Sequence, residues 1–222
     1  MKSKVRYLLT EKEFGSWSLG SYKNKFIKIF KWFLIFYIPI YLVASYSNNY
    51  LMPKDGPRAA IVVSGFAFGV MDFWIAPVVY VGSYPGFIYY FNNQDIPVDY
   101  IVNATKEDLL EVVKDEKYQS VVLVGHGSRN SWRAADESVT NMELKMMDML
   151  SEFKKKSGEW IQLSCAVPGV YDEHLGEHVM QNKEDVYFYS EDTVGTPSMV
   201  ADALSGFKYI KYRTEEWRKT PR

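Results

Sequence analysis

Short apolar blocks alternate with polar stretches along the second half of the chain. Runs of four to six apolar, β-branched or aromatic residues predict buried strands, and they occur at 59–64, 98–102, 121–124, 160–163 and 186–190. Segments whose apolar residues recur at helical spacing lie between these runs. Two of the predicted helices begin with capping-box pairs, Thr105 with Asp108 and Thr140 with Glu143. This alternation predicts a three-layer α/β/α domain with a mainly parallel sheet, over residues 55–210.

Further helices are predicted at 171–180 and 197–204, and residues 211–222 are expected to form a solvated basic tail. The helix that opens at Thr140 has apolar residues at helical spacing, which predicts that they fill the core: Leu144, Met147, Met149 and Leu150.

The first half of the chain is far more apolar. A basic segment, 1–25, precedes a predicted transmembrane helix at 26–47, whose length approaches the roughly 20 residues that a span requires. The positive-inside rule then predicts a single-pass membrane protein with a cytoplasmic N-terminus. An interfacial helix is the alternative. Residues 59–91 are also apolar and could hold a second span, but their prolines and glycines favour a hairpin at 78–91.

Composition narrows the possible partners. The 222 residues carry a formal net charge of −1, which argues against a nucleic-acid binder. Aromatic residues crowd into the first hundred positions, as in proteins that meet a membrane interface. A single cysteine excludes an intramolecular disulfide and any multi-cysteine metal site.

That cysteine and one histidine stand at the ends of predicted strands. The run 121–124 leads to His126, which glycines flank on both sides, and the run 160–163 leads to Cys165. One strand–helix unit separates them, so a right-handed crossover would place both at the same edge of the sheet. A thiol beside an imidazole is the minimal cysteine nucleophile with its base.

A strand followed by His-Gly, and then a strand followed by a small residue and Cys, resembles the caspase-like (clan CD) cysteine peptidases. These include caspases, metacaspases, legumains, separases and CHAT-type proteases, and the resemblance covers roughly residues 59–205. Residues 103–110 are also similar to the helix start that precedes the His-Gly block in CHAT-type members. The sequence departs from the family after Cys165, at 166–169. Family members often have an acidic residue or a glutamine directly before the small residue and the cysteine, whereas Gln162 lies one position earlier in this chain.

The resemblance implies a cysteine endopeptidase that acts on a peptide or protein and needs no cofactor. His126 would be the general base or acid, Cys165 the nucleophile, and the Gly127 N–H part of the oxyanion hole. Asp136, Asp172 and Glu173 would line a substrate pocket for a basic side chain, as acids do in the metacaspase and legumain branches; the alternative is that they are ordinary acids of a loop and a helix start.

Two other functions stay open. The chain could be a catalytically inactive caspase-like module that works as a membrane-tethered subunit of a protein complex. Alternatively, His174, Glu177 and His178 fit the H-x-x-E-H pattern, in which two histidines on one helix face bind zinc and the glutamate acts as a base. That zinc hydrolase would need a third protein ligand.

Overall fold

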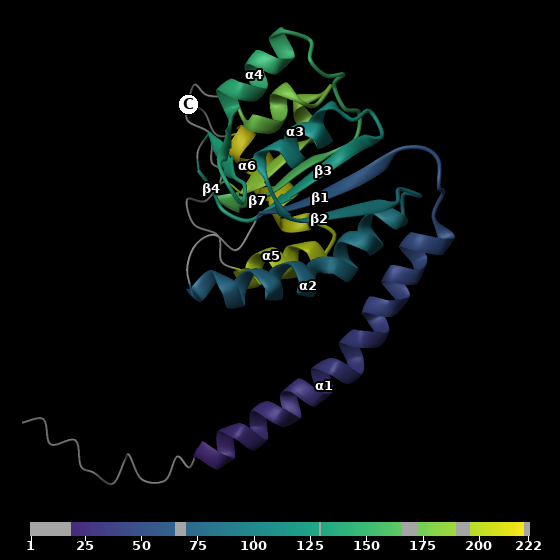
Figure 1. Cartoon of the computed structure of the whole chain (residues 1–222), viewed down its shortest axis with the longest axis vertical. Helices are drawn as coiled ribbons and strands as arrows, with labels where there is room; N and C mark the ends of the chain where they lie inside the picture. The colour runs from purple at the N-terminus through teal and green to yellow at the C-terminus, as the bar shows by residue number, and fades with distance from the viewer. Residues whose placement is uncertain (1–18, 65–69, 129, 166–172, 190–195, 220–222) are drawn as a thin grey trace, which may run out of the picture. The chain divides into compact units, whose positions relative to one another are not determined.

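Five parallel strands form the central sheet, in the order β2-β1-β3-β7-β8 (Figure 1). The computed structural model describes residues 19–64, 70–128, 130–165, 173–189 and 196–219. The strands are β1 (Arg58–Ser64), β2 (Val98–Ala104), β3 (Tyr118–Val124), β7 (Trp160–Cys165) and β8 (Val186–Tyr189). Each lies within two residues of a predicted run, except at the start of β3, so the predicted parallel α/β sheet is confirmed.

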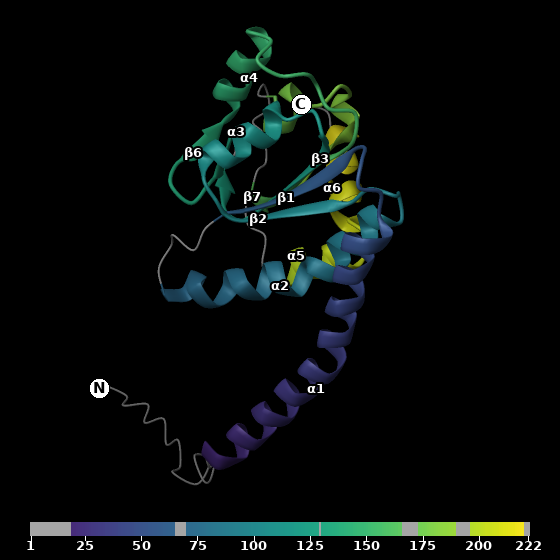
Figure 2. The same cartoon turned by 45° about the vertical axis from the view of Figure 1, so that its right-hand side comes forward.

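Helices cover both faces of this sheet. One face packs against α2 (Val70–Asn92) and α5 (Thr196–Leu204), and the other against α3 (Lys106–Lys114) and α4 (Asn141–Met149) (Figures 1 and 2). Alternate residues of β1 and β3 belong to opposite cores, as expected of strands buried on both sides. Both predicted capping boxes form, at Thr105 and at Thr140.

A helix replaces the predicted hairpin at 78–91. The apolar stretch folds as α2 and buries Phe87, Ile88 and Phe91 against the sheet. Gly86 lies where α2 meets α5, because a Cβ atom on it would stand 2.7 Å from the carbonyl oxygen of Ala203. Glycine, which usually indicates a turn, here permits two helices to approach closely.

The predicted solvated tail is also wrong. Residues Lys208–Lys219 form α6, which packs along β8 and buries Ile210 and Thr214. The Thr214 hydroxyl donates to the Phe188 carbonyl at 2.7 Å and accepts from the Phe188 N–H at 2.8 Å. It therefore satisfies the backbone of an edge strand in place of a neighbouring strand.

Two of the four residues at the helical spacing of α4 that were predicted to fill the core are exposed. Leu144 and Met147 are buried, but Met149 and Leu150 are 76% and 67% exposed. The helix ends at Met149, so these two residues lie at its last turn and beyond, where the sheet no longer covers them.

The chain divides into two units, residues 1–42 and 43–222. Helix α1 (Leu19–Tyr46) contains most of the predicted anchor, and the π-helix η1 (Ser47–Leu51) follows it. Within the part of the chain that the structure describes, none of the helices combines the length and apolar character needed to cross a membrane.

Candidate functional site

The ends of β3 and β7 bring His126 and Cys165 to one edge of the sheet. The two strands are adjacent and parallel, and Val124 pairs with Leu163. The Gly125 N–H donates to the Leu163 carbonyl at 3.3 Å, which extends the ladder beyond β3. His126 and Cys165 each follow this last pair by two residues. The predicted sharing of one edge is confirmed, while the catalytic roles of the two residues stay predictions.

The backbone beside Cys165 is irregular. On β7, Gln162 pairs with Phe188, yet Cys165 pairs with Tyr189, the very next residue of β8. Two extra residues on β7 therefore form a bulge. Bulges often occur next to active sites, where they redirect a side chain.

Gly125 is required by the packing of this edge. Its φ angle is +139°, in the region that favours glycine, and a Cβ atom on it would lie 2.8 Å from the Cβ of Ser64. Ser64 ends β1, which has β2 on one side and β3 on the other. Strand order reverses at this point, and open α/β sheets bind ligands outside the carboxyl ends of the strands at such a reversal. Sequence reasoning missed Ser64, although the predicted strand 59–64 ends on this polar residue.

A small antiparallel sheet holds the backbone that follows His126. It consists of β4 (Gly127–Ser128), β5 (Ser131–Arg133) and β6 (Ser138–Thr140). The Arg133 N–H donates to the His126 carbonyl at 3.0 Å, and the His126 side chain is exposed. Trp132 anchors this sheet in the core, because it is fully buried. The main chain of His126 is thus fixed on one side by β3 and on the other by β5.

The same ladder determines the direction of the Gly127 N–H. Residue pairs in an antiparallel ladder alternate between hydrogen-bonded and non-hydrogen-bonded. The bond from Arg133 to His126 makes 126/133 a bonded pair, so Gly127 and Trp132 form a non-bonded pair. The Gly127 N–H therefore points away from β5, and an oxyanion donor must be free of its neighbouring strand in this way.

The acids proposed for a substrate pocket have other partners. Asp136 accepts a hydrogen bond from the Lys106 N–H, at the first residue of α3, at 2.8 Å, and this bond lowers the pKa of its carboxyl group. Glu173 pairs with Lys183 at 2.5 Å and with Lys145 at 3.6 Å, and Lys183 lowers its pKa. Asp172 lies outside the described residues. Asp136 thus caps a helix, and Glu173 belongs to an ion-pair cluster.

The H-x-x-E-H stretch does not form the predicted helix. Its described part contains only a 3₁₀ turn, Leu175–His178, and His174 caps this turn by accepting from the Gly176 N–H at 3.1 Å through Nδ1. The His174 ring is buried and stacks on Phe188. Burial, with the nearby charges of Arg218 and His178, lowers its pKa to about 3.

His178 and Glu177 also have local environments that differ from a metal site. His178 is buried, with Nε2 at 3.7 Å from a Glu173 oxygen, and desolvation lowers its pKa. Glu177 lies 3.4 Å from the Lys183 ammonium. Among the described residues, no three His, Cys, Asp or Glu side chains come together as a metal-ligand group.

No protein-family model matches the sequence, and no curated protein matches it significantly. The site itself combines an exposed imidazole, a cysteine at the end of the adjacent strand and a backbone N–H that points away from β5.

Proposed function

We propose that this protein is a cysteine endopeptidase of caspase-like fold that acts through a Cys165–His126 dyad. One observation carries the proposal: β3 and β7 are adjacent and parallel, and His126 and Cys165 each follow the last paired residues, Val124 and Leu163, by two positions at the carboxyl edge. The bulge in β7, the reversal of strand order beside β3 and the orientation of Gly127 support it independently.

In this mechanism the Cys165 thiolate attacks the carbonyl carbon of a peptide bond. The Gly127 N–H stabilises the negative charge that develops on the carbonyl oxygen. His126 takes the thiol proton and gives it to the leaving amine, and water then hydrolyses the acyl-enzyme, which restores the thiol.

The lone cysteine makes this proposal simple to test. We expect iodoacetamide or a peptidyl acyloxymethyl ketone to label Cys165 near pH 6, well below the usual thiol pKa of about 8.5, because the imidazole favours the thiolate. His126→Ala should slow labelling by about tenfold or more.

His178→Ala provides the matched control, because it also removes a histidine but lies outside the proposed dyad. Circular dichroism of each variant tests whether it is folded. Equal labelling rates in the wild type and His126→Ala would contradict the dyad and favour the inactive, complex-forming module. Zinc retained after dialysis by the wild type but not by His178→Ala would favour the hydrolase centred on His174 and His178.

We also propose that α1 attaches the protein to a membrane. Four consecutive apolar residues, Ile40 to Val43, are exposed by 55%, 36%, 59% and 69%. At 100° per residue they point in all directions, so no single face of the helix is polar at this level. A helix that is apolar all round is usually buried in protein or in lipid.

Flotation of the full chain with liposomes tests the attachment. We expect the protein to float, and we expect Leu42→Glu/Val43→Glu to float much less, because burying a charge in hydrocarbon is unfavourable. Extraction with alkaline carbonate separates a single-pass anchor, which resists it, from an interfacial helix, which is released. Protease accessibility in sealed vesicles tests the predicted cytoplasmic N-terminus. An unaffected double variant would contradict attachment through α1.

A further inference from the structure

The chain leaves α1 at the amino edge of the sheet, where the strands begin, and is held there firmly. Asn48 is buried and bonds both backbone groups of Val98, the first residue of β2, with distances of 2.9 and 2.8 Å. Ser45 donates to the Tyr84 hydroxyl of α2 at 3.1 Å. All of these residues belong to the same compact unit as the sheet. The end of α1 is therefore part of the domain rather than a loose tether.

Large apolar side chains remain exposed beside Ser45 and Asn48, at the end of α1 and in η1. Tyr46 and Tyr50 stack with ring centroids 5.2 Å apart and are 57% and 74% exposed, and Leu51 is 62% exposed. Tyrosine is enriched where a protein meets the lipid headgroups, because its ring is apolar and its hydroxyl is polar. The two tyrosines and Leu51 are thus side chains of the kind found where a protein contacts lipid headgroups.

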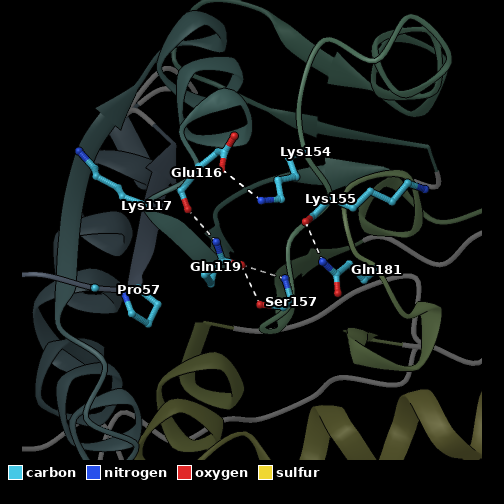
Figure 3. A pocket seen from close by; sticks show the side chains of 9 residues that line it. Pro57, Glu116, Lys117, Gln119, Lys154, Lys155, Ser157 and Gln181 are labelled. Carbon is cyan, nitrogen blue, oxygen red and sulfur yellow. Dashed lines mark hydrogen bonds and ion pairs between the residues drawn. The ribbon is translucent and has the colours of Figure 1, made fainter.

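Lysines surround a pocket of about 350 Å³ at the same edge. Its lining comes from the second residue of β3, Gln119, and from segments that precede β1, β3, β7 and β8. It includes one acid, Glu116, and three lysines, Lys117, Lys154 and Lys155 (Figure 3). Lys154 points towards Glu116, whereas the ammonium groups of Lys117 and Lys155 lie on opposite sides of the rim (Figure 3).

These lysines are available to a partner. Each pairs with a carboxylate: Lys117 with Asp115 at 3.2 Å, Lys154 with Glu116 at 3.4 Å and Lys155 with Asp148 at 2.9 Å. Lys117 also lies over the Tyr118 ring, 4.6 Å from its centroid. Exposed ion pairs contribute little, so the ammonium groups can be shared with phosphate at small cost. Lys156, between Lys155 and Ser157 in the sequence, is fully buried, and its ammonium group donates to the carbonyls of Asp115 and Tyr118.

We propose that the amino edge of the sheet docks on the surface of an anionic lipid bilayer. Tyr46, Tyr50 and Leu51 enter the headgroup layer, and Lys117, Lys154 and Lys155 contact the lipid phosphates. This orientation rests on the proposed attachment through α1, and it is independent of the proposed peptidase chemistry.

Docking in this way sets the height of the carboxyl edge. The strands β1 and β3 are seven residues long, so they span roughly 20 Å at about 3.3 Å per residue. His126 and Cys165 then lie about that far from the bilayer surface. The substrate class that follows is a protein segment outside the membrane, such as a loop or a soluble domain, rather than a peptide bond within the lipid.

Two single-cysteine labels test the orientation. In a Cys165→Ser background, Ser157→Cys places a fluorophore at the amino edge, and Glu137→Cys places one at the opposite edge. The full chain is bound to phosphatidylcholine vesicles with or without phosphatidylglycerol, and with spin-labelled headgroups that quench on contact. We expect the label at 157 to lose most of its fluorescence and the label at 137 to be unaffected.

The charge of the edge is tested in the same assay. Lys154→Gln/Lys155→Gln should abolish most of the quenching at 157, as should omission of phosphatidylglycerol. The control Lys106→Gln/Lys145→Gln removes two lysines that are also ion-paired but do not line the pocket, and it should change nothing.

The outcomes separate the two proposals. Equal quenching of both labels, stronger quenching at 137, or quenching at 157 that ignores both the lysines and the anionic lipid would overturn the orientation alone. A chain that does not bind vesicles at all would overturn the attachment through α1, and the orientation with it.

Discussion

Substitution of Gly86 by alanine tests the close contact between α2 and α5. The added Cβ would lie 2.7 Å from the carbonyl oxygen of Ala203, 2.8 Å from its carbonyl carbon and 2.9 Å from the Leu204 nitrogen. All three are backbone atoms of α5 or its end, so no side chain can rotate away. Overpacking a tight contact costs about 1–3 kcal/mol, and a rigid backbone neighbour favours the upper value. Alanine regains about 1 kcal/mol of helix propensity. We therefore expect a net loss of roughly 2 kcal/mol.

Gly82→Ala is the matched control, one helical turn earlier in α2. Its Cβ would meet only the Val200 side chain, at 3.6 and 3.8 Å, which is ordinary van der Waals contact. The propensity gain of about 1 kcal/mol is then unopposed. The two substitutions have the same chemistry and lie in the same helix, yet we expect them to differ by roughly 3 kcal/mol and in sign.

Urea unfolding of the full chain in mild detergent measures both effects. Trp132 and Trp160 are fully buried on the far face of the sheet, so their fluorescence reports the folding of the α/β domain. A Gly86→Ala protein as stable as the wild type, or stabilised to the same extent as Gly82→Ala, would refute the close α2–α5 contact. That result would also revive the hairpin that the sequence predicts for this segment.

Two further predictions concern buried polar groups. Thr214→Val should destabilise the protein by about 1–3 kcal/mol, because it leaves the Phe188 N–H and C=O unpaired at the sheet edge. Thr214→Ser keeps the hydroxyl and should retain most of this stability in the same urea assay. Equal losses in the two variants would contradict the role of the hydroxyl. Burial depresses the folded-state pKa of His174 to about 3, so the stability present above pH 6.5 should fall by up to about 5 kcal/mol as the pH decreases towards 3. His174→Asn keeps a cap acceptor and should flatten this pH dependence of the urea midpoint; an unchanged slope would assign the effect to other groups.

The sequence by itself determined the parallel sheet and the edge that holds the candidate site. Strand runs and capping boxes are local signals: a continuous run of apolar side chains, and a threonine whose hydroxyl reaches an N–H three residues on. His126 and Cys165 follow two such runs directly, so the handedness of one crossover sufficed to place them together.

Only the tertiary structure decided the nature of α2. Two prolines and two glycines argue against a helix, at a cost of several kcal/mol. Burial of Phe87, Ile88 and Phe91 offsets this by roughly 1.5–3 kcal/mol for each side chain. The local sequence shows the unfavourable helix propensity of the prolines and glycines but not the sheet surface that buries the apolar side chains. For this reason the sequence predicts a hairpin here.

The same limit explains α6, the exposed end of α4 and the amino edge. Thr214 is unremarkable until β8 lies beside it, and the spacing of Met149 and Leu150 does not reveal that the sheet ends before them. The lysines of the amino edge are far apart in the chain and meet only because parallel strands all begin on one side. Periodicity records which side chains lie on one face of an element, whereas packing decides what that face meets.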